Sequence, residues 1–217
     1  MFEAVRAFDR SASGYDDWYR EEKGRQVLEA ESALVDALIP GDGVGLEIGA
    51  GTGVFAESLT NDNRIIVCID LSVNMLTRAR RRGLPCVLGS AESLPIRKGV
   101  LGFTYMITVM EFLPAPVKAF GEAAKIGESL VVLFVNRDSS WGRFYAEMAS
   151  KDDPIFRFAH LYSLEDVGAV AQAAGLTLVE AHGTLTTGPT DPAPGGNIVE
   201  PSPKAGVIAV KMATHRN

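Results

Sequence analysis

The chain has 217 residues, of which 47% are apolar and 22% are charged, a composition typical of a folded globular protein. Its 27 acidic and 21 basic residues give a net charge of −6, which disfavours nucleic acid as a partner. Met1–Arg6 contains charges where a signal peptide needs an apolar core, and no apolar run approaches the length of a membrane span. We therefore expect a cytoplasmic protein that does not act on a membrane.

The two cysteines, Cys68 and Cys86, each lie in an apolar run, where buried and reduced thiols are expected. The sequence has neither a disulfide framework nor the spacing of metal ligands, so it predicts no metal site. Its length suits one main domain with appendages. We expect residues 1–40 to form an N-terminal aromatic lid and a helix, and residues 41–217 to form the main domain.

The N-terminal region is rich in aromatic residues. Tyr15, Trp18 and Tyr19 lie close together among aspartates. Two interpretations are open: the rings could staple the start of the helix that follows, or they could close as a lid over a bound ligand. From Tyr19 to Ile39, apolar residues recur at helical spacing, and Pro40 ends this predicted helix.

Val44–Gly53 combines a short apolar run, an acid and three glycines at alternate positions. This pattern is typical of a buried parallel strand that turns through a tight loop into a helix. Because Gly49, Gly51 and Gly53 have no Cβ, a ligand can lie directly against their backbone. The free N–H groups at the start of the next helix, at residues 54–59, would face that ligand.

Four further apolar runs with helical patterns between them are predicted to be strands. They are Arg64–Asp70, Pro85–Leu88, Leu101–Val109 and Ser129–Val135. Strands that alternate with helices imply right-handed βαβ units and a parallel sheet. The sequence therefore predicts a doubly wound α/β domain.

The C-terminal third has a looser pattern. Ser163 is expected to cap a helix at residues 164–174, and Leu176–Ala181 and Ala205–Met212 are expected to be the last two strands. Between these strands, Gly183–Lys204 contains five prolines, and a loop this long is either functional or mobile. The sequence does not decide between the two.

The glycine loop by itself is compatible with two kinds of cofactor. Gly51-x-Gly53-x-x-Ala56, followed by Asp70, fits the dinucleotide fingerprint and would suit an NAD(P)-dependent oxidoreductase. Two other features favour a different cofactor. Glu47 lies two residues before the first glycine, and Ser90-Ala91-Glu92 follows the third predicted strand.

With these features the chain resembles the class I S-adenosylmethionine-dependent methyltransferases, particularly their small-molecule, single-domain group. The resemblance rests on Leu46–Gly53, Ile69–Leu76 and Gly89–Pro95 in the family's order and spacing. It implies a mostly parallel seven-stranded Rossmann-like sheet with an antiparallel last strand, and makes residues 41–217 the cofactor-binding domain. It also implies S-adenosylmethionine as the cofactor, S-adenosylhomocysteine as the product and a small-molecule methyl acceptor.

The resemblance also assigns parts of the cofactor to particular loops. Glu47 would lie near the ammonium group, and Asp70 would accept hydrogen bonds from both ribose hydroxyls. Leu71 and Met75 would pack on the adenine, whose edge the third loop would meet. The implied cofactor-binding residues are Glu47, Gly49, Ala50, Gly51, Thr52, Gly53, Asp70, Leu71, Met75, Ser90, Ala91, Glu92 and Thr108.

Methyl transfer requires little of the protein, because a sulfonium methyl group is already an activated electrophile. The enzyme aligns the acceptor and excludes water, and a general base is needed only where the acceptor must first lose a proton. Glu111 and His160 are candidates for that base, although ordinary structural roles explain both equally well. Where many relatives have paired histidines, this chain has Glu111-Phe112.

The acceptor pocket is expected from segments that flank the carboxyl edge of the sheet, namely the aromatic N-terminal segment, the residues after Val135 and Phe156–Tyr162. Its expected lid and substrate residues are Tyr15, Trp18, Tyr19, Phe158 and Tyr162. Their rings suggest a small, partly apolar acceptor. Because no base stands out, a cofactor-binding protein without catalytic activity is a further alternative. The sequence leaves open which atom is methylated and whether the protein forms oligomers.

Overall fold

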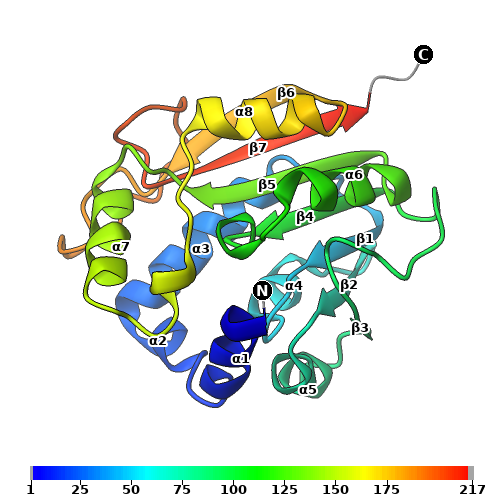
Figure 1. The fold of residues 1–217 in the computed structure, drawn as a ribbon, viewed down its shortest axis with the longest axis horizontal. Coiled ribbons are helices and arrows are strands. Elements are labelled where there is room, and N and C mark those ends of the chain that lie inside the picture. The colour runs from blue at the N-terminus through cyan, green and yellow to red at the C-terminus, as the bar shows by residue number, and fades with distance from the viewer. Residues whose placement is uncertain (1, 215–217) are drawn as a thin grey trace.

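A computed structural model describes residues 2–214, in which a seven-stranded sheet lies between two layers of helices (Figure 1). The strand order is β3-β2-β1-β4-β5-β7-β6. The first five strands pair in parallel, and β7 is antiparallel to both β5 and β6. This confirms the predicted doubly wound α/β fold with its antiparallel last strand.

The strands are β1 Gly43–Ile48, β2 Arg64–Asp70, β3 Cys86–Leu88, β4 Phe103–Ile107, β5 Ser129–Val135, β6 Leu176–Thr184 and β7 Val207–Thr214. The helices are α1 Phe2–Ser11, α2 Asp17–Arg20, α3 Glu22–Asp36, α4 Val54–Leu59, α5 Val73–Arg81, α6 Pro116–Ile126, α7 Ser140–Ser150 and α8 Leu164–Ala173. Two 3-10 turns, η1 Met110–Phe112 and η2 Phe156–Phe158, follow β4 and α7. Within residues 2–214, no helix is both long enough and apolar enough to cross a membrane.

The N-terminal region differs from the prediction. The single helix expected over Tyr19–Ile39 is two helices, because Glu21 has an extended backbone (ψ 149°) between α2 and α3. This turn brings Gly24 against the carbonyl oxygen of Trp18, where a Cβ would lie only 1.9 Å away. The sequence analysis also missed α1, which packs beside α5 (Figure 1). We call α1 and α2, residues 2–20, the lid.

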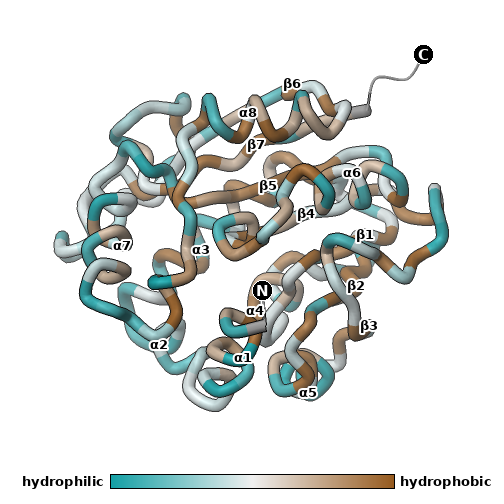
Figure 2. Tube along the Cα trace, in the orientation of Figure 1, coloured by the Kyte–Doolittle hydropathy of each residue, from teal (hydrophilic) through white to brown (hydrophobic). Residues whose placement is uncertain are grey.

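The core has two sides because side chains alternate along each strand. In β5, Val131, Leu133 and Val135 face the layer that contains α3 and α4. The residues between them face the layer that contains α6 and α8. Burial on both faces explains why β5 is apolar at nearly every position, and β5 and β7 are mainly brown in Figure 2.

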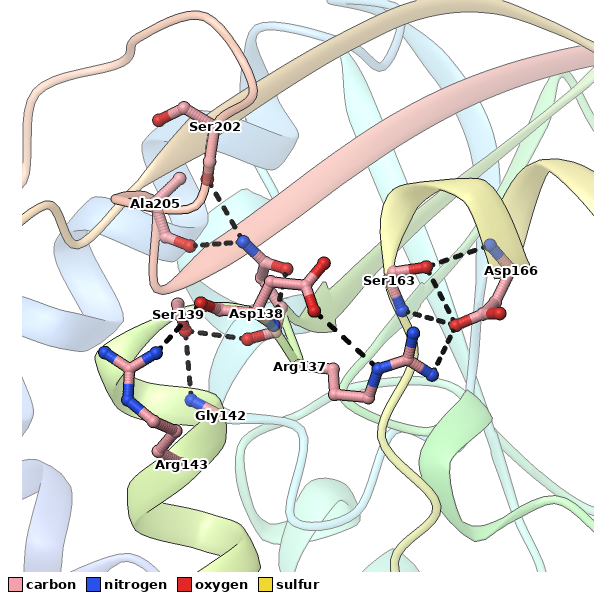
Figure 3. Close-up of polar contacts among 10 residues, drawn as sticks. Arg137, Asp138, Ser139, Gly142, Arg143, Ser163, Asp166, Ser202 and Ala205 are labelled. Carbon is pink, nitrogen blue, oxygen red and sulfur yellow. Dashed lines mark hydrogen bonds and ion pairs between the residues drawn. The ribbon is translucent and has the colours of Figure 1, made fainter.

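The turn after β5 fixes the proline-rich loop predicted at residues 183–204. The buried side-chain amide of Asn136 donates hydrogen bonds to the carbonyl oxygens of Ser202 (3.1 Å) and Ala205 (3.0 Å). Its oxygen accepts one from the backbone N–H of Asp138 (3.1 Å). Figure 3 shows Ser202 and Ala205 converging on this turn. The loop is therefore held beside the end of β5.

Two helix caps extend the same network. The Ser139 hydroxyl accepts a hydrogen bond from the backbone N–H of Gly142 and so caps α7. Ser163 and Asp166 form a reciprocal capping box at the start of α8, as the sequence predicts for Ser163. Arg137 forms an ion pair with Asp166 at 2.7 Å (Figure 3). These contacts set where α7 and the segment before α8 lie.

We expect Asn136→Ala to lower the free energy of unfolding by about 1–3 kcal/mol, because it leaves buried carbonyl groups without donors. Urea denaturation followed by circular dichroism measures the loss. Asn197→Ala changes an exposed residue of the same loop and is the control, which should stay close to the wild type. Equal stability of the Asn136 variant and the control would contradict the role of this amide.

Candidate cofactor and acceptor site

A cavity lies at the carboxyl ends of β1, β2, β3 and β4, where the predicted cofactor loops meet. Six loop residues from the predicted cofactor set line it together with Leu71, Met75 and Thr108. Its lining is Ala4, Val5, Phe8, Tyr15, Gly49, Gly51, Asp70, Leu71, Ser72, Met75, Gly89, Ser90, Ala91, Glu92, Ile107, Thr108, Val109, Phe112, Leu113 and Pro114. We call it the cofactor cavity.

The glycine loop after β1 has a left-handed backbone, which L side chains rarely adopt. The φ angles of Gly49, Gly51 and Gly53 are 75°, 53° and 77°. A Cβ on Gly49 would lie 2.5 Å from Val109, and one on Gly53 would lie 2.6 Å from Leu84. At Gly51 the nearest atom would be 4.0 Å away, so the open side of this glycine faces the cavity. The loop thus forms a cradle that a side chain would fill.

Asp70 lies at the end of β2 and joins that strand to the glycine loop. One carboxylate oxygen accepts a hydrogen bond from the N–H of Gly51 (2.9 Å), and the other accepts one from the N–H of Ser72 (2.7 Å). Burial raises the pKa of Asp70, and these backbone N–H groups oppose the shift. A carboxylate has about four acceptor positions, so Asp70 can still accept hydrogen bonds from a diol in the cavity.

The lid covers this cavity through a contact that the sequence analysis missed. Asp9 on α1 accepts hydrogen bonds from the hydroxyl of Ser72 (2.6 Å) and from the backbone N–H of Asn74 (3.0 Å). The Ser72 hydrogen bond is the main reason that the pKa of Asp9 is lowered. Val5 and Phe8 on the same helix line the cavity. The helical spacing of Val5 and Phe8 and the acid beside Phe8 were the sequence signals that could have predicted this helix and its contact.

A second contact fixes the other end of the lid. The Thr52 hydroxyl donates a hydrogen bond to Asp16 (2.6 Å), and Arg82 forms an ion pair with the same carboxylate (2.6 Å). The Arg82 side chain also donates to the backbone oxygen of Thr52. Thr52 therefore holds the lid against the glycine loop and does not line the cofactor cavity.

Three other predicted cofactor residues, Glu47, Ala50 and Gly53, do not line the cavity either. Glu47 is buried beneath the loop, where it accepts a hydrogen bond from the Tyr105 hydroxyl (3.2 Å) and one from the backbone N–H of Ala56. Burial raises the pKa of Glu47 to about 8. The structure thus places Glu47 as a support beneath the glycine loop.

A second, larger cavity of about 420 Å³ adjoins the first, and Phe8, Tyr15, Thr108 and Phe112 line both. Its walls come from the lid, α3, α7 and η2. Its lining is Phe8, Tyr15, Trp18, Tyr19, Lys23, Val27, Glu31, Thr108, Glu111, Phe112, Val135, Trp141, Phe144, Tyr145, Met148, Ile155, Phe156, Ala159, Leu161, Leu185, Pro189 and Val207. We call it the acceptor cavity.

The predicted substrate residues divide into two groups. Tyr15, Trp18 and Tyr19 line the acceptor cavity, whereas Phe158 and Tyr162 do not. Phe158 packs under Arg157, and Tyr162 packs against the ring of His160. The sequence analysis expected these segments to build the pocket but did not single out Phe156 or the rings of α7, which only the fold brings opposite the lid. These rings are Trp141, Phe144 and Tyr145.

The two candidate bases also differ in position. Glu111 lines the acceptor cavity, and its Oε1 accepts a hydrogen bond from the N–H of Val135 (2.8 Å). Burial raises the pKa of Glu111 to about 7. His160 lines neither cavity, and its backbone N–H donates to the carbonyl oxygen of Glu111 (2.7 Å). Thr108 has a φ of 49°, and this left-handed turn lies between the two cavities.

The cofactor cavity lies where the strand order reverses, which is where doubly wound α/β proteins bind nucleoside cofactors. A family model described as a methyltransferase domain matches residues 46–133, from β1 into β5. An uncharacterized protein of Methanocaldococcus jannaschii is 29% identical over 184 residues, which cover 83% of this chain and 86% of that protein. A malonyl-[acyl-carrier protein] O-methyltransferase of Geobacter sulfurreducens is 31% identical over 131 residues, 55% of this chain and about half (47%) of that protein.

A solved structure extends the match over the whole fold. It is a SAM-dependent methyltransferase of Thermotoga maritima, described as a possible histamine N-methyltransferase, with a TM-score of 0.85 and 27% identity. The match covers 97% of this chain and 99% of that one. The methyltransferase-domain model and this solved structure together indicate an S-adenosylmethionine-dependent methyltransferase, with S-adenosylmethionine as its cofactor. This replaces the oxidoreductase interpretation that the glycine spacing alone left open.

We expect Asp70→Asn to weaken the binding of S-adenosylhomocysteine by about 1–3 kcal/mol, because a charged acceptor is lost from the cavity. Isothermal titration calorimetry measures the affinity, and circular dichroism checks the fold. The control is Asp166→Asn, since Asp166 also accepts from backbone at a helix start but lines neither cavity. Unchanged affinity in the folded Asp70 variant would refute its assignment to the ribose.

The raised pKa of Glu47 leads to a separate prediction about how the free energy of unfolding depends on pH. Above its ordinary pKa of 4.5 the unfolded chain loses this proton, whereas the folded chain keeps it until about pH 8. The folded state therefore binds more protons in this window, and the free energy of unfolding falls as the pH rises from about 5 to about 8. Glu47→Gln should flatten this decline by on the order of 1 kcal/mol per pH unit.

Urea denaturation at several pH values measures the effect of Glu47→Gln. Glu29→Gln, at an exposed position of α3, is the control and should leave the wild-type decline in place. Parallel stability curves for the wild type and the Glu47 variant would show that this carboxyl group is ionised in the folded protein.

Proposed function

We propose that the enzyme transfers the methyl group of S-adenosylmethionine to a small molecule bound in the acceptor cavity. The observation that carries the proposal is that this cavity joins the cofactor cavity at Phe8, Tyr15, Thr108 and Phe112. A cofactor in the first cavity would present its methyl group at this junction. The acceptor cavity has a volume of about 420 Å³ and a mainly apolar lining, in the range of small-molecule sites.

The chain's own residues would align the reaction and exclude water. The lid is tied down at Asp9 and Asp16, and its rings cover the junction of the two cavities. An in-line displacement needs the acceptor atom close to the methyl carbon and opposite the departing sulfur. The aromatic walls would hold the acceptor in that position. The cofactor supplies the activated methyl group, and sulfur leaves as a neutral thioether.

The names of the relatives do not fix the acceptor atom. The Geobacter sulfurreducens relative is named as an O-methyltransferase, and the Thermotoga maritima protein is described as a possible N-methyltransferase. Both names refer to transfer to an atom that carries a lone pair. The acceptor class for this chain therefore has to be argued from its own cavity.

We expect Ala159→Trp to abolish methyl transfer while leaving the affinity for S-adenosylhomocysteine unchanged, because the new ring would fill only the acceptor cavity. Calorimetry measures binding, and mass spectrometry measures transfer across a panel of small molecules. Ala146→Trp, at an exposed position of α7, is the control and should retain transfer. Two results would contradict the proposal: full activity of the Ala159 variant, and cofactor binding by the wild type without transfer to any member of the panel.

A further inference from the structure

The acceptor cavity contains two buried carboxyl groups that the fold does not explain. Glu31 on α3 is 6% exposed and Glu111 in η1 is 3% exposed. Burial raises the pKa of Glu31, and the charge of Glu111 adds to this shift. Burying an ionisable group is costly unless it is paired, and apolar residues of similar volume would pack here at lower cost.

Within residues 2–214, the oxygens of these two carboxyl groups accept few hydrogen bonds. Glu111 Oε2 is buried and has no hydrogen-bond partner within residues 2–214. No donor to the Glu31 carboxyl group is found in the same part of the chain, and neither glutamate has an ion pair there. These oxygens are therefore available to a ligand that carries N–H donors.

The other polar groups of the cavity do not satisfy the two glutamates. Lys23, the cation among the lining residues, donates instead to the carbonyl oxygens of Pro189 and Asp191 (2.6 Å to the latter) and lies 5.9 Å from the centre of the Trp141 ring. The remaining titratable groups are tyrosines. Glu31 contributes to the raised pKa values of Tyr15, Tyr19 and Tyr145, and Glu111 also contributes for Tyr145. The hydroxyls of these tyrosines stay protonated.

Aromatic rings form most of the wall around the carboxyl groups. Tyr145 stacks on Phe156 with ring centres 4.3 Å apart, and Phe112 lies 6.4 Å from Phe156. On the lid side, Trp18 contacts Tyr19 edge to face at 5.0 Å. Ring faces attract organic cations, and they also bury the apolar body of a ligand. Rings and unpaired carboxylates together favour a ligand with a positive or N–H-rich end.

We propose that the acceptor is a small organic amine, bound with its nitrogen against Glu31 and Glu111 and its apolar body among the rings, and that this nitrogen is methylated. The inference rests on the proposed function. It disfavours carboxylic acids as acceptors, because a carboxylate brings no N–H donor to the two glutamates and is repelled by whichever of them is ionised. Alcohols lack the positive charge that these carboxylates favour.

The reaction balances without any further reactant. An ammonium ion gives one proton to a carboxylate of the pair, which exposes the nitrogen lone pair. The lone pair forms the new N–C bond as the C–S bond breaks, and its electron pair stays on sulfur in S-adenosylhomocysteine. The methylated amine leaves as an ammonium ion, and the carboxyl group releases the proton it took up to solvent. Burial raises the pKa of Glu111 to about 7, so near neutral pH this carboxyl group is partly ionised and can take up the proton.

The test uses the intact enzyme, labelled S-adenosylmethionine and matched acceptors of equal carbon skeleton. The amines are benzylamine, phenethylamine, tryptamine and hexylamine, each compared with its alcohol and its carboxylic acid. We expect methyl transfer to the amines and not to the acids, with alcohols at least about tenfold slower. Mass spectrometry of the product identifies the methylated atom.

Variants then test the two glutamates. Glu31→Gln and Glu111→Gln keep the side-chain volume and should each raise KM for the amine by about tenfold or more, with the affinity for S-adenosylhomocysteine unchanged. They should also shift the pH dependence of kcat/KM. Glu29→Gln, on the exposed side of α3, is the control and should behave as the wild type.

The outcomes separate the inference from the proposed function. Transfer to alcohols or acids in preference to amines, or no amine transfer by an enzyme that binds S-adenosylhomocysteine, would overturn the inference and leave the proposed function in place. Unchanged KM and pH dependence in both glutamine variants would also overturn it. Failure of the folded wild type to bind S-adenosylhomocysteine would overturn the proposed function itself.

Discussion

The site depends on the reversal of strand order between β1 and β4. On one side of this point the sheet continues from β1 to β2 and β3, and on the other side it continues from β4 to β5. Loops that leave the carboxyl ends of neighbouring strands in opposite directions leave a crevice between them. Gly49 and Gly51 form one wall of this crevice, and Thr108 lies on the other. The left-handed glycines keep it open, and the Asp70 carboxylate ties the glycine loop to the end of β2.

The lid turns this open crevice into two joined cavities. Asp9 and Asp16 attach it to residues at the rim through short hydrogen bonds and an ion pair. An attachment of this kind suits a cover that must open for the cofactor and close for transfer. The far wall consists of α7 and η2, and the Asn136 network fixes the loop beside them (Figure 3).

Local patterns in the sequence predicted the strands and the α/β class, and the family resemblance supplied the antiparallel last strand. β2 and β5 agree with the predicted strands at both ends, since their continuous apolar runs end at Asp70 and Asn136. The cofactor loops were predictable because glycine spacing and strand ends are local features. The acceptor cavity was predicted only in part, since Glu31, Trp141 and Phe156 meet through the tertiary fold and no spacing links them. The split between α2 and α3 was missed because it depends on the packing of one glycine against a neighbouring backbone.

The central claim is that the methyl group is transferred at the junction of the two cavities to an amine held by buried carboxylates. A crystal structure of the enzyme with S-adenosylhomocysteine and phenethylamine tests it most directly. The account predicts the cofactor's sulfur beside Thr108 and Phe112, and the amine nitrogen about 3 Å from a carboxylate oxygen of Glu31 or Glu111. A sulfur atom facing away from the acceptor cavity, or an amine bound elsewhere, would contradict it.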